Sequence, residues 1–373
     1  MISSFRNLIK QKTLSTRFYS SVTQKAIGSY EGVKNSSGKY VATLIPGDGI
    51  GPEISDSVVK IFEAANVPIE WEVTDVTPVL VDGVTKIPED AERSIKKNKI
   101  ALKGPLMTPI GKGYVSLNLT LRRTFNLYAN VRPCKSIPGY KTLYHNVDTV
   151  LIRENTEGEY SGIEHEVISG VMQSIKLITR DASRRVARFA FEHARSTGRN
   201  HVTAIHKASI MKLSDGLFLD ACREVGSEYP DVKFETLLLD KACLEVVQTP
   251  EHYANTVMVM PNLYGDIMSD LCAGLIGGLG LTPSGNIGSD ASIFESVHGT
   301  APDIAGKNMA NPTALILSAC MMLEHMSLHD KADLIRNATL NTIAQAQHLT
   351  GDLGGKGTTS EFTSAIIKNI QSS

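Results

Sequence analysis

The sequence predicts an α/β protein whose sheet is covered by helices on both faces. Short apolar runs typical of buried strands alternate with longer segments of helical periodicity through most of the 373 residues. A glycine-rich turn, residues 46–51, joins the first apolar run to the first helix. At this length the chain can bury a large core, in one large or two ordinary domains.

Each expected element has a local reason in the sequence. The apolar strand Lys39–Ile45 precedes the helix Pro52–Ala65, which has proline in its first turn and an apolar face. The helix Asp181–Thr197 is expected to have Asp181 as its N-cap and to end before Gly198. The other expected strands are Ile69–Val76, Lys99–Gly104, Val202–His206, Phe234–Leu239 and Thr256–Met260, with extended segments at Thr149–Arg153 and Ser174–Thr179, and the other expected helices are Ser116–Leu127 (capped by Ser116), Asn311–Met326, Ala332–His348 and Ser360–Gln371.

Composition excludes some classes of function. The net charge is −1, so the chain has no general attraction to nucleic acid or to an acidic membrane. The longest apolar stretches are far shorter than the roughly 20 residues of a membrane span. The five cysteines are scattered and contain no Cys-x-x-Cys pair, which argues against a disulfide framework and a zinc site and indicates a reducing compartment.

The N-terminal segment differs from the rest of the chain. Residues 1–30 contain no Asp or Glu but carry five Lys and Arg residues among many Ser and Thr. This composition is typical of a mitochondrial transit peptide, and a disordered basic tail is the alternative. We expect residues 1–25 to be removed and the protein to reside in the mitochondrial matrix.

Asp266 and Asp270 are the most informative pair of residues. The apolar run Val257–Met260 ends at Pro261, and a helical pattern is expected from about Asp266. Residues four apart share one helix face, so both carboxylates would project together from the end of a strand. They favour a divalent metal site, although acids in a first helical turn are also stabilised by the helix dipole.

Three arginines near expected strand or helix ends form a candidate anion site. Arg122, Arg132 and Arg153 carry planar guanidinium groups that suit carboxylates. Ser116 and Asn118 add short hydrogen-bonding side chains. Together they would suit a substrate with several negative charges, although each arginine alone has an ordinary surface role as its alternative.

Tyr160 and Lys207 are candidates for proton transfer. Tyr160 lies in a polar stretch with two glycines, too hydrophilic for a core, and can donate a proton if nearby cations lower its pKa from about 10. Lys207 ends an expected strand, at the edge of the sheet where ligands gather. A structural tyrosine and an exposed lysine are the alternatives.

The glycine turn does not match a dinucleotide-binding fingerprint. Gly47 and Gly49 have the spacing of Gly-x-Gly-x-x-Gly, but Gly51 comes one residue early and Pro52 fills the next position. A standard Rossmann site is therefore not expected here.

Taken together, these segments resemble the β-decarboxylating dehydrogenases, a family that includes isocitrate, 3-isopropylmalate, homoisocitrate and tartrate dehydrogenases. The resemblance extends from Val41 to Thr359. Within the family the chain is most similar to the catalytic, alpha-type subunits of mitochondrial NAD-dependent isocitrate dehydrogenases. Six long motifs carry the resemblance: residues 47–53, 103–109, 116–122, 153–164, 262–270 and 295–312.

The resemblance implies a non-Rossmann fold of two domains with the site between them. Residues 39–128 and 285–373 would form a large, cofactor-binding domain, and residues 129–284 a smaller one with the metal site and the dimer interface. The site would form across a dimer, with Lys207 and Asp240 supplied by the second protomer.

The resemblance also implies roles for individual residues. Tyr160 and Lys207 match the catalytic pair of the family. The residues that match isocitrate-binding positions are Ser116, Asn118, Arg122, Arg132 and Arg153; those that match ligands of Mg²⁺ or Mn²⁺ are Asp240, Asp266 and Asp270; and those that match cofactor-binding positions are Thr108, His298, Asp303, Ile304 and Asn311.

Asp303 indicates NAD as the cofactor. A carboxylate can accept hydrogen bonds from a free ribose 2′-hydroxyl but repels a 2′-phosphate. The implied function is oxidative decarboxylation of isocitrate to 2-oxoglutarate and CO₂, within a hetero-oligomer that also contains related regulatory subunits.

Two alternatives remain. A sibling dehydrogenase of another 2-hydroxy acid is disfavoured because Ser116 and Asn118 would face an apolar substituent. A non-catalytic regulatory subunit is disfavoured because each expected catalytic, substrate and metal position carries its residue.

Overall fold

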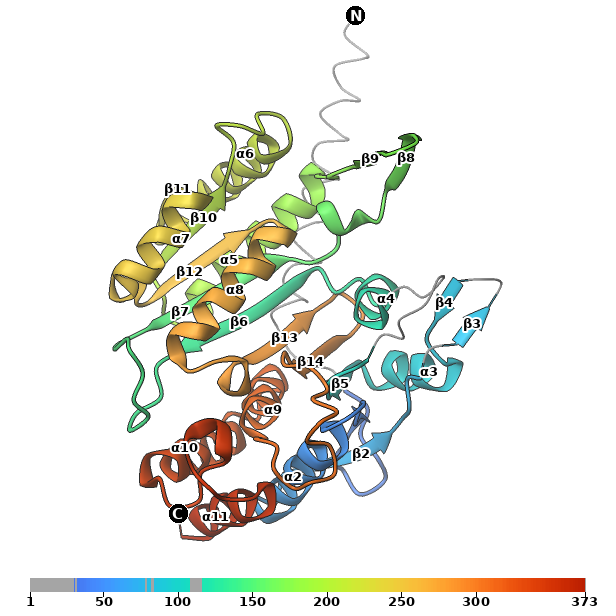
Figure 1. The fold of residues 1–373 in the computed structure, drawn as a ribbon, viewed down its shortest axis with the longest axis vertical. Coiled ribbons are helices and arrows are strands. Elements are labelled where there is room, and N and C mark those ends of the chain that lie inside the picture. Colours follow the sequence, from blue (N-terminus) through green and yellow to red (C-terminus); the bar gives the residue numbers. More distant parts are fainter. Residues whose placement is uncertain (1–29, 31, 78, 82–83, 108–115, 373) are drawn as a thin grey trace, which may run out of the picture.

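A ten-stranded mixed sheet forms the centre of the molecule (Figure 1). The computed structural model describes residues 30, 32–77, 79–81, 84–107 and 116–372. The strand order is β11-β10-β12-β7-β6-β13-β14-β5-β1-β2. The strands are β1 Tyr40–Ile45, β2 Ile69–Val73, β5 Ile100–Lys103, β6 Ala129–Lys135, β7 Asp148–Glu154, β10 His201–His206, β11 Lys233–Leu238, β12 Thr256–Met260, β13 Pro283–Ile287 and β14 Ser292–Ser296.

The sheet is parallel at both ends and antiparallel in the middle. Strands β11, β10, β12 and β7 pair in parallel, as do β14, β5, β1 and β2. Between them, β7, β6, β13 and β14 pair in antiparallel fashion. Two small antiparallel ribbons lie outside the sheet: β3 Val79–Val81 with β4 Val84–Lys86, and β8 Glu164–Ile168 with β9 Val171–Ser174.

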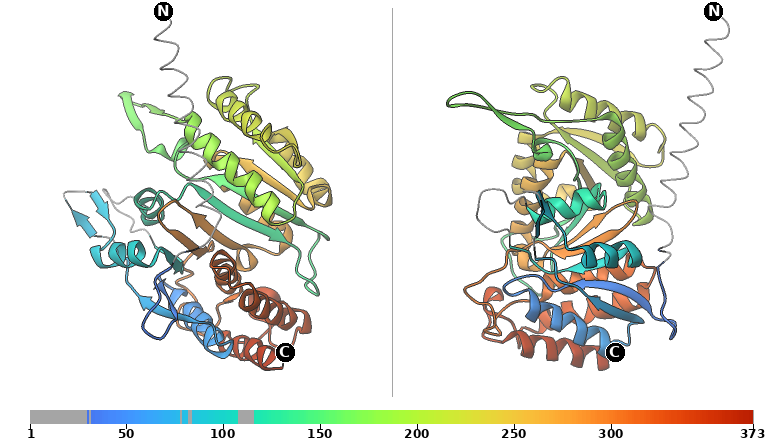
Figure 2. Two further views of the ribbon diagram at one scale, coloured as in Figure 1. Left: turned by 180° about the vertical axis from the view of Figure 1, so that it is seen from behind. Right: turned by 90° about the vertical axis from the view of Figure 1, so that its right-hand side faces the viewer.

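Helices cover both faces of this sheet. Helix α8 contacts β6, β7 and β12 on the face that is in front in Figure 1, and α5 crosses β7, β10 and β12 on the other face (Figure 2). The α-helices are α2 Gly51–Ala64, α3 Glu89–Asn98, α4 Leu117–Thr124, α5 Arg180–Ser196, α6 Ser214–Gly226, α7 Leu239–Gln248, α8 Asn262–Ile276, α9 Thr313–His325, α10 His329–Gln345 and α11 Thr359–Gln371. The short 3₁₀ turns are η1 Glu159–Ser161, η2 Pro250–Tyr253, η3 Leu279–Leu281 and η4 Gly351–Leu353.

The expected α/β class is confirmed, and most expected elements are present within a few residues of their predicted ends. The glycines of the turn after β1 lie in close contact with neighbouring backbone. A Cβ on Gly47 would lie 2.2 Å from the carbonyl oxygen of Pro105, and one on Gly51 would lie 2.2 Å from that of Pro46. The turn therefore packs tightly on the residues that follow β5.

Three predicted helix starts need correction. The N-cap of α5 is Thr179, whose hydroxyl accepts a hydrogen bond from the backbone N–H of Ala182 (3.3 Å), so Asp181 lies inside the first turn. Ser116 occupies the N-cap position of α4, but its side chain makes no capping hydrogen bond. Helix α8 begins at Asn262, four residues before the predicted start.

The earlier start of α8 bears on the site. Asp266 lies beyond the first turn, and that turn contains no acidic residue. The helix dipole acts mainly on the first and last turns, so it does not account for the carboxylates of Asp266 and Asp270.

Several elements went unpredicted. They include α3, β6, β13, β14 and both ribbons. The sequence of β13 is Pro-Ser-Gly-Asn-Ile, which lacks the β-branched alternation of a typical strand. In the described part of the chain no helix is long and apolar enough to cross a membrane.

Candidate active site

The centre of the candidate site is Arg153, which lies near the end of β7 and against α8. Its side chain is almost wholly buried, at 2% exposure. Its Nε and Nη2 both donate to Oδ1 of Asn262, at 2.9 and 2.7 Å, and its Nη1 forms an ion pair with Asp266. Gly265 makes this approach possible, because a Cβ there would lie 2.5 Å from the Cβ and Cγ of Arg153.

A second pair of the same kind lies one helical turn further along α8. Arg132 of β6 donates from Nη1 to Oδ1 of Asp270 (2.7 Å) and to the hydroxyl of Ser269 (2.5 Å). Arg132 is buried, whereas the side chain of Asp270 is 55% exposed. The two carboxylates of α8 are therefore each held by an arginine from a neighbouring strand.

Helix α4 brings the remaining predicted substrate residues to the same region. Its N-cap is Ser116, and Asn118 and Arg122 follow on the helix. The charge of Arg122 contributes to lowering the pKa of Arg153, so these two cations lie within electrostatic range. The buried Oδ1 of Asn118 and Nε of Arg132 have no hydrogen-bond partner among the described residues. These two free polar atoms are suited to contact a polar ligand.

Crowding of positive charge is evident at Arg153. Burial first, and then the charges of Arg122 and Arg132, lower the pKa of Arg153 to about 10, although Asp266 opposes the shift. Three guanidinium groups at one end of the sheet create a local attraction for a ligand with several carboxylates.

Tyr160 lies beside the arginine–carboxylate pair. Its hydroxyl donates to Oδ2 of Asp266 (2.7 Å), and the guanidinium carbon of Arg153 lies 5.5 Å from the centre of its ring. Burial raises the pKa of Tyr160, and the hydrogen bond and charge of Asp266 raise it further, against the lowering effect of Arg153 and Arg122. The cations do lower this pKa, but burial and Asp266 outweigh them, so the pKa is raised overall and the phenol keeps its proton.

The carboxyl groups of α8 fit a divalent cation in their chemistry. Burial alone would raise the pKa of Asp266, but Arg153, the hydroxyl of Tyr160 and Arg132 together lower it, so the group is ionised. Carboxylate oxygens are preferred ligands of Mg²⁺ and Mn²⁺. In the described part of this single chain no group of three His, Cys, Asp or Glu side chains comes together that could hold a metal ion.

Lys207 and Asp240 form a separate pair. The Nζ of Lys207 lies 2.6 Å from Oδ1 of Asp240, and the Asp240 side chain is 66% exposed. Lys207 follows β10, and Asp240 lies in the first turn of α7. Among the described residues neither makes a hydrogen bond or ion pair with Tyr160, Asp266 or Asp270. The backbone N–H of Lys207 is held by the buried carboxylate of Asp215 (2.6 Å).

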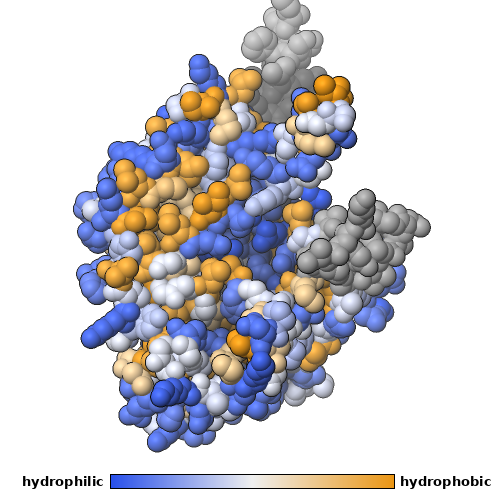
Figure 3. Space-filling view, in the orientation of Figure 1, coloured by the Kyte–Doolittle hydropathy of each residue, from blue (hydrophilic) through white to orange (hydrophobic). Residues whose placement is uncertain are grey.

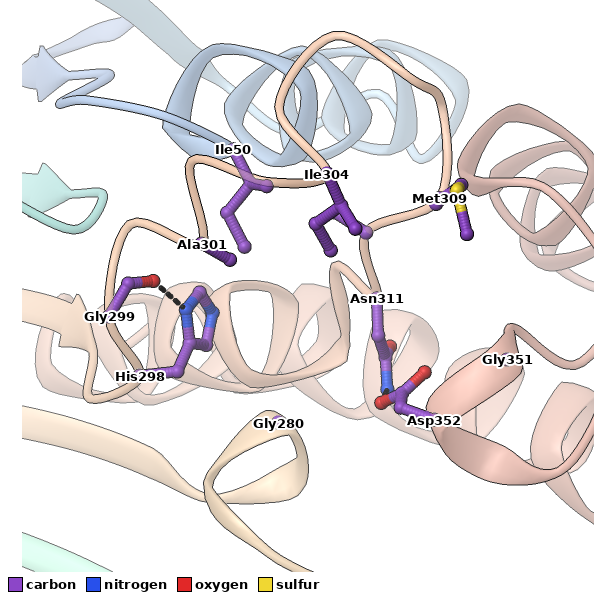
Figure 4. Close-up of a pocket in the computed structure, with 11 residues that line it drawn as sticks. Ile50, Gly280, His298, Gly299, Ala301, Ile304, Met309, Asn311, Gly351 and Asp352 are labelled. Carbon is purple, nitrogen blue, oxygen red and sulfur yellow. Dashed lines mark hydrogen bonds between the residues drawn. The ribbon is translucent and has the colours of Figure 1, made fainter.

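A cavity of about 580 Å³ lies at some of the predicted cofactor residues (Figure 4). His298, Ile304 and Asn311 line it together with Ile50 and Asp352. Oδ1 of Asn311 accepts hydrogen bonds from the backbone and hydroxyl of Thr313, and its Nδ2 donates to Asp352 (2.9 Å). The amide of Asn311 is thereby fixed in one orientation.

His298 presents a hydrogen-bond acceptor. Its Nδ1 lies 3.0 Å from the carbonyl oxygen of Gly299, which can only accept, so Nδ1 carries the proton. Burial lowers the pKa of His298, which keeps the ring neutral. Its buried Nε2 has no partner among the described residues, and it is therefore an available acceptor.

Two predicted cofactor residues lie elsewhere. Asp303 is exposed next to Ile304 and is not part of the cavity lining. Thr108 lies outside the described residues.

Sequence reasoning missed three residues with clear roles in the site. Asn262 and Ser269 hold the two buried arginines, and Asp352 anchors the cofactor-side asparagine. The spacing of Asn262 from Asp266, four residues on one helix, was the available signal for the first of them. No local pattern marks Asp352, which lies 41 residues from its partner.

Comparison with known proteins places these features in context. Residues 41–366 match the family described as isocitrate/isopropylmalate dehydrogenase. The mitochondrial protein named isocitrate dehydrogenase [NAD] subunit 2 of Schizosaccharomyces pombe is 63% identical over 369 residues, which cover 99% of this chain and 97% of that protein. A mitochondrial protein of Dictyostelium discoideum, named as a regulatory subunit of isocitrate dehydrogenase [NAD], is 58% identical over 94% of this chain and 99% of its own length. The crystal structure of isocitrate dehydrogenase from Methylococcus capsulatus aligns with a TM-score of 0.83 and 45% identity, covering 89% of this chain and 99% of that one.

Proposed function

This chain belongs to the isocitrate/isopropylmalate dehydrogenase family, and from that premise we propose that it is the catalytic subunit of a mitochondrial NAD-dependent isocitrate dehydrogenase. The observation that carries the proposal is the group formed by Arg153, Tyr160 and Asp266, in which a proton donor, a cation and a metal-ligating carboxylate are in direct contact. The predicted family, the enzyme class and the mitochondrial location are confirmed by the relatives.

The choice between a catalytic and a regulatory role rests on the site residues. A relative named as a regulatory subunit is also 58% identical, so similarity along the chain does not separate the two roles. In support of the catalytic role, the two strand arginines are each paired with a carboxylate of α8, and Tyr160 contacts the same carboxylate as Arg153. A chain that only bound an effector would have no need for a positioned proton donor.

Substrate binding is assigned to α4 and the strand arginines. Arg122, Arg132 and Arg153 would bind carboxylates of isocitrate, because guanidinium groups pair with them in bidentate fashion. Ser116 and the free Oδ1 of Asn118 would contact its remaining polar groups. An apolar substituent at this place would leave both side chains without partners, which disfavours a sibling substrate.

The chain's own residues provide for proton transfer. Tyr160 keeps its proton until a basic carbon forms beside it, and Asp266 fixes the direction of its hydroxyl. We assign the base to a Lys207–Asp240 pair supplied by the partner protomer, in line with the lack of any hydrogen bond between this pair and Tyr160 among the described residues. When bound, a divalent cation would polarise substrate oxygens and NAD would accept a hydride.

Mg²⁺ or Mn²⁺ would be held by Asp266 and Asp270 with the third carboxylate, Asp240, from the partner. The exposed position of Asp240 leaves its carboxylate accessible to a neighbouring chain. NAD would place its adenine beside His298, whose free Nε2 can accept from the exocyclic amine, and its ribose near Asp303.

Exposed apolar side chains support assembly with a related subunit. Figure 3 shows apolar residues gathered over α7 and α8 and at the tip of the β8–β9 ribbon. They include Ile267, Leu244 and Ile168, which are 55%, 56% and 67% exposed. Such patches mark protein interfaces. We assign this surface to the dimer contact within a hetero-oligomer.

Two further assignments belong to this proposal. The first is the division into a large domain, residues 39–128 and 285–373, and a small domain, residues 129–284. The second is a transit peptide in residues 1–25, which lie outside the described residues. The proposed function includes neither nucleic acid nor a membrane as a partner of the protein.

NADH formation from isocitrate tests the proposal. The tagged chain, purified from its own mitochondria with its native partners, is assayed with Mg²⁺ and NAD. Tyr160→Phe is expected to lower kcat by two or more orders of magnitude with little change in the KM for isocitrate, because one general acid contributes about 10²–10⁴-fold. A variant with the turnover of the wild type would remove Tyr160 as the proton donor, and with it the observation that carries the catalytic assignment.

A further inference from the structure

Arg123 lies next to a predicted substrate residue but has no role in the proposed chemistry. It occupies the last turn of α4, directly after Arg122, and its side chain is exposed. Its Nη2 donates to two backbone carbonyl oxygens, those of Tyr160 (3.0 Å) and Ser161 (2.9 Å). Among the described residues these are the hydrogen bonds that join α4 to the turn η1.

The two carbonyls are the ones that a short 3₁₀ turn leaves without partners at its end. The turn closes at Gly162, which adopts a left-handed conformation (φ +73°). A Cβ at Gly162 would lie 3.3 Å from the Nη2 of Arg123, so glycine also leaves room for the guanidinium group. The guanidinium group of Arg123 therefore lies at the C-terminal end of η1, where free carbonyl oxygens favour a positive charge.

The other backbone anchors of η1 come from one side. Gly158 exchanges backbone hydrogen bonds with Leu177, and the hydroxyl of Ser161 donates to the carbonyl oxygen of Ile175. Both partners belong to the segment that follows the β8–β9 ribbon. None of these hydrogen bonds connects the Tyr160 turn to α4, the helix that carries Ser116, Asn118 and Arg122. The hydrogen bonds of Arg123 make that connection.

We propose that Arg123 is a positioning residue that fixes the Tyr160 turn on α4, and thereby sets the proton donor relative to the substrate bound by that helix. The inference rests on the proposed function, because it needs Tyr160 as the donor. Arg123 belongs to the segment assigned to the large domain, and Tyr160 to the segment assigned to the small domain. The contact therefore forms in the relative arrangement of these two segments that the structure shows.

Kinetics of substitutions at Arg123 test the inference. In the enzyme purified with its native partners, Arg123→Ala is expected to lower kcat about five- to tenfold, because two exposed charge-assisted hydrogen bonds are lost together. The KM for isocitrate should stay within about twofold, because Arg123 does not reach the substrate. Arg123→Lys should recover part of the loss. Arg93→Ala is the matched control, since Arg93 is an exposed helical arginine whose ion pair is with Asp90.

A double-mutant cycle separates positioning from general damage. If Arg123 acts through the hydroxyl of Tyr160, Arg123→Ala should have no further effect on kcat in a Tyr160→Phe background. Equal losses in both backgrounds, or an unchanged kcat in Arg123→Ala, would overturn the role of Arg123 while leaving the proposed function intact. A wild-type enzyme that forms no NADH from isocitrate would overturn both.

Discussion

Replacing Gly265 by alanine tests whether the close approach of α8 to Arg153 organises the site. Gly265 lies inside α8, and a Cβ there would come within 2.5 Å of the Cβ and Cγ of Arg153. These atoms are next to the backbone of β7 and have little freedom to move. Gly274, on the same helix, has no heavy atom within 4 Å of its corresponding Cβ position, so Gly274→Ala is the matched control.

The two substitutions share one effect and differ in another. Both exchange glycine for the best helix former, which favours the folded helix by about 1 kcal/mol. Only Gly265→Ala overpacks the site, which typically costs about 1–3 kcal/mol. We therefore expect Gly274→Ala to be more stable than the wild type by about 1 kcal/mol, and Gly265→Ala to range from unchanged to less stable by about 2 kcal/mol.

The larger consequence of Gly265→Ala is for catalysis. Displacing Arg153 weakens its contacts with Asn262 and Asp266 and misplaces its guanidinium group for a substrate carboxylate. Losing one charged hydrogen bond of about 1.5–3 kcal/mol lowers kcat/KM about 10- to 150-fold. Gly274→Ala should retain the wild-type value.

Denaturant unfolding and steady-state kinetics of the two variants provide the measurement. If Gly265→Ala kept wild-type kcat/KM and gained the same stability as Gly274→Ala, Arg153 would not depend on this contact, and the geometric reasoning would be wrong.

Three other changes have defined outcomes. Asn262→Ala leaves two buried donors of Arg153 without their acceptor and should lower the unfolding free energy by about 2–3 kcal/mol, measured in urea; an unchanged midpoint would contradict the burial argument. Burial would raise the pKa of Glu295, but Lys103 at 2.9 Å lowers it to about 2. The ionised Glu295 therefore adds about 3 kcal/mol to the free energy of unfolding above pH 4.5, and this contribution is lost as the pH falls towards 2. Glu295→Gln should be less stable at pH 7 and show a flatter acid unfolding curve over that range. Asp303→Lys should shift the ratio of kcat/KM values from NAD towards NADP, and an unchanged ratio would remove Asp303 from cofactor selection.

The sequence predicted the long elements well because their signals are local. Helices such as α2 and α5 have an apolar face at helical spacing, and β1, β10 and β12 are short, mostly apolar and largely buried runs. Strands β13 and β14 carry buried polar residues instead. Asn286 is 2% exposed because its amide donates to Glu295 (2.7 Å), while its Oδ1 accepts from Asn130 and Asn155. These hydrogen-bond partners of Asn286 come from three other segments of the chain, so no local sequence pattern could indicate that it is buried.

The residues proposed to act in the site could be predicted from their types, whereas the residues that hold them in place could not. Arg153 and Asp266 stood out as charged residues at element ends. Asn262 came to notice only through the fold, because it lies 109 residues from the arginine it holds. The net direction of the Tyr160 pKa could not be read from the sequence for a related reason: the nearby cations were expected, but the hydrogen bond to Asp266 and the burial were not.

The spacing of residues along α8 matches the spacing of residues on β6 and β7, the strands that it packs against. Arg153 lies opposite Asn130 in the register of β7 and β6, and Arg132 is two residues beyond Asn130, so both arginines point to the same face of the sheet. Two residues along a strand advance about 7 Å, and four helical residues advance about 6 Å. One turn of α8 therefore matches the two-residue step along the strands from the level of Arg153 to that of Arg132, so Asp266 pairs with Arg153 and Asp270 with Arg132. The i, i+4 spacing of the two carboxylates thus fits the spacing of the two arginines, and inserting one residue between the carboxylates would prevent the two pairs from forming together.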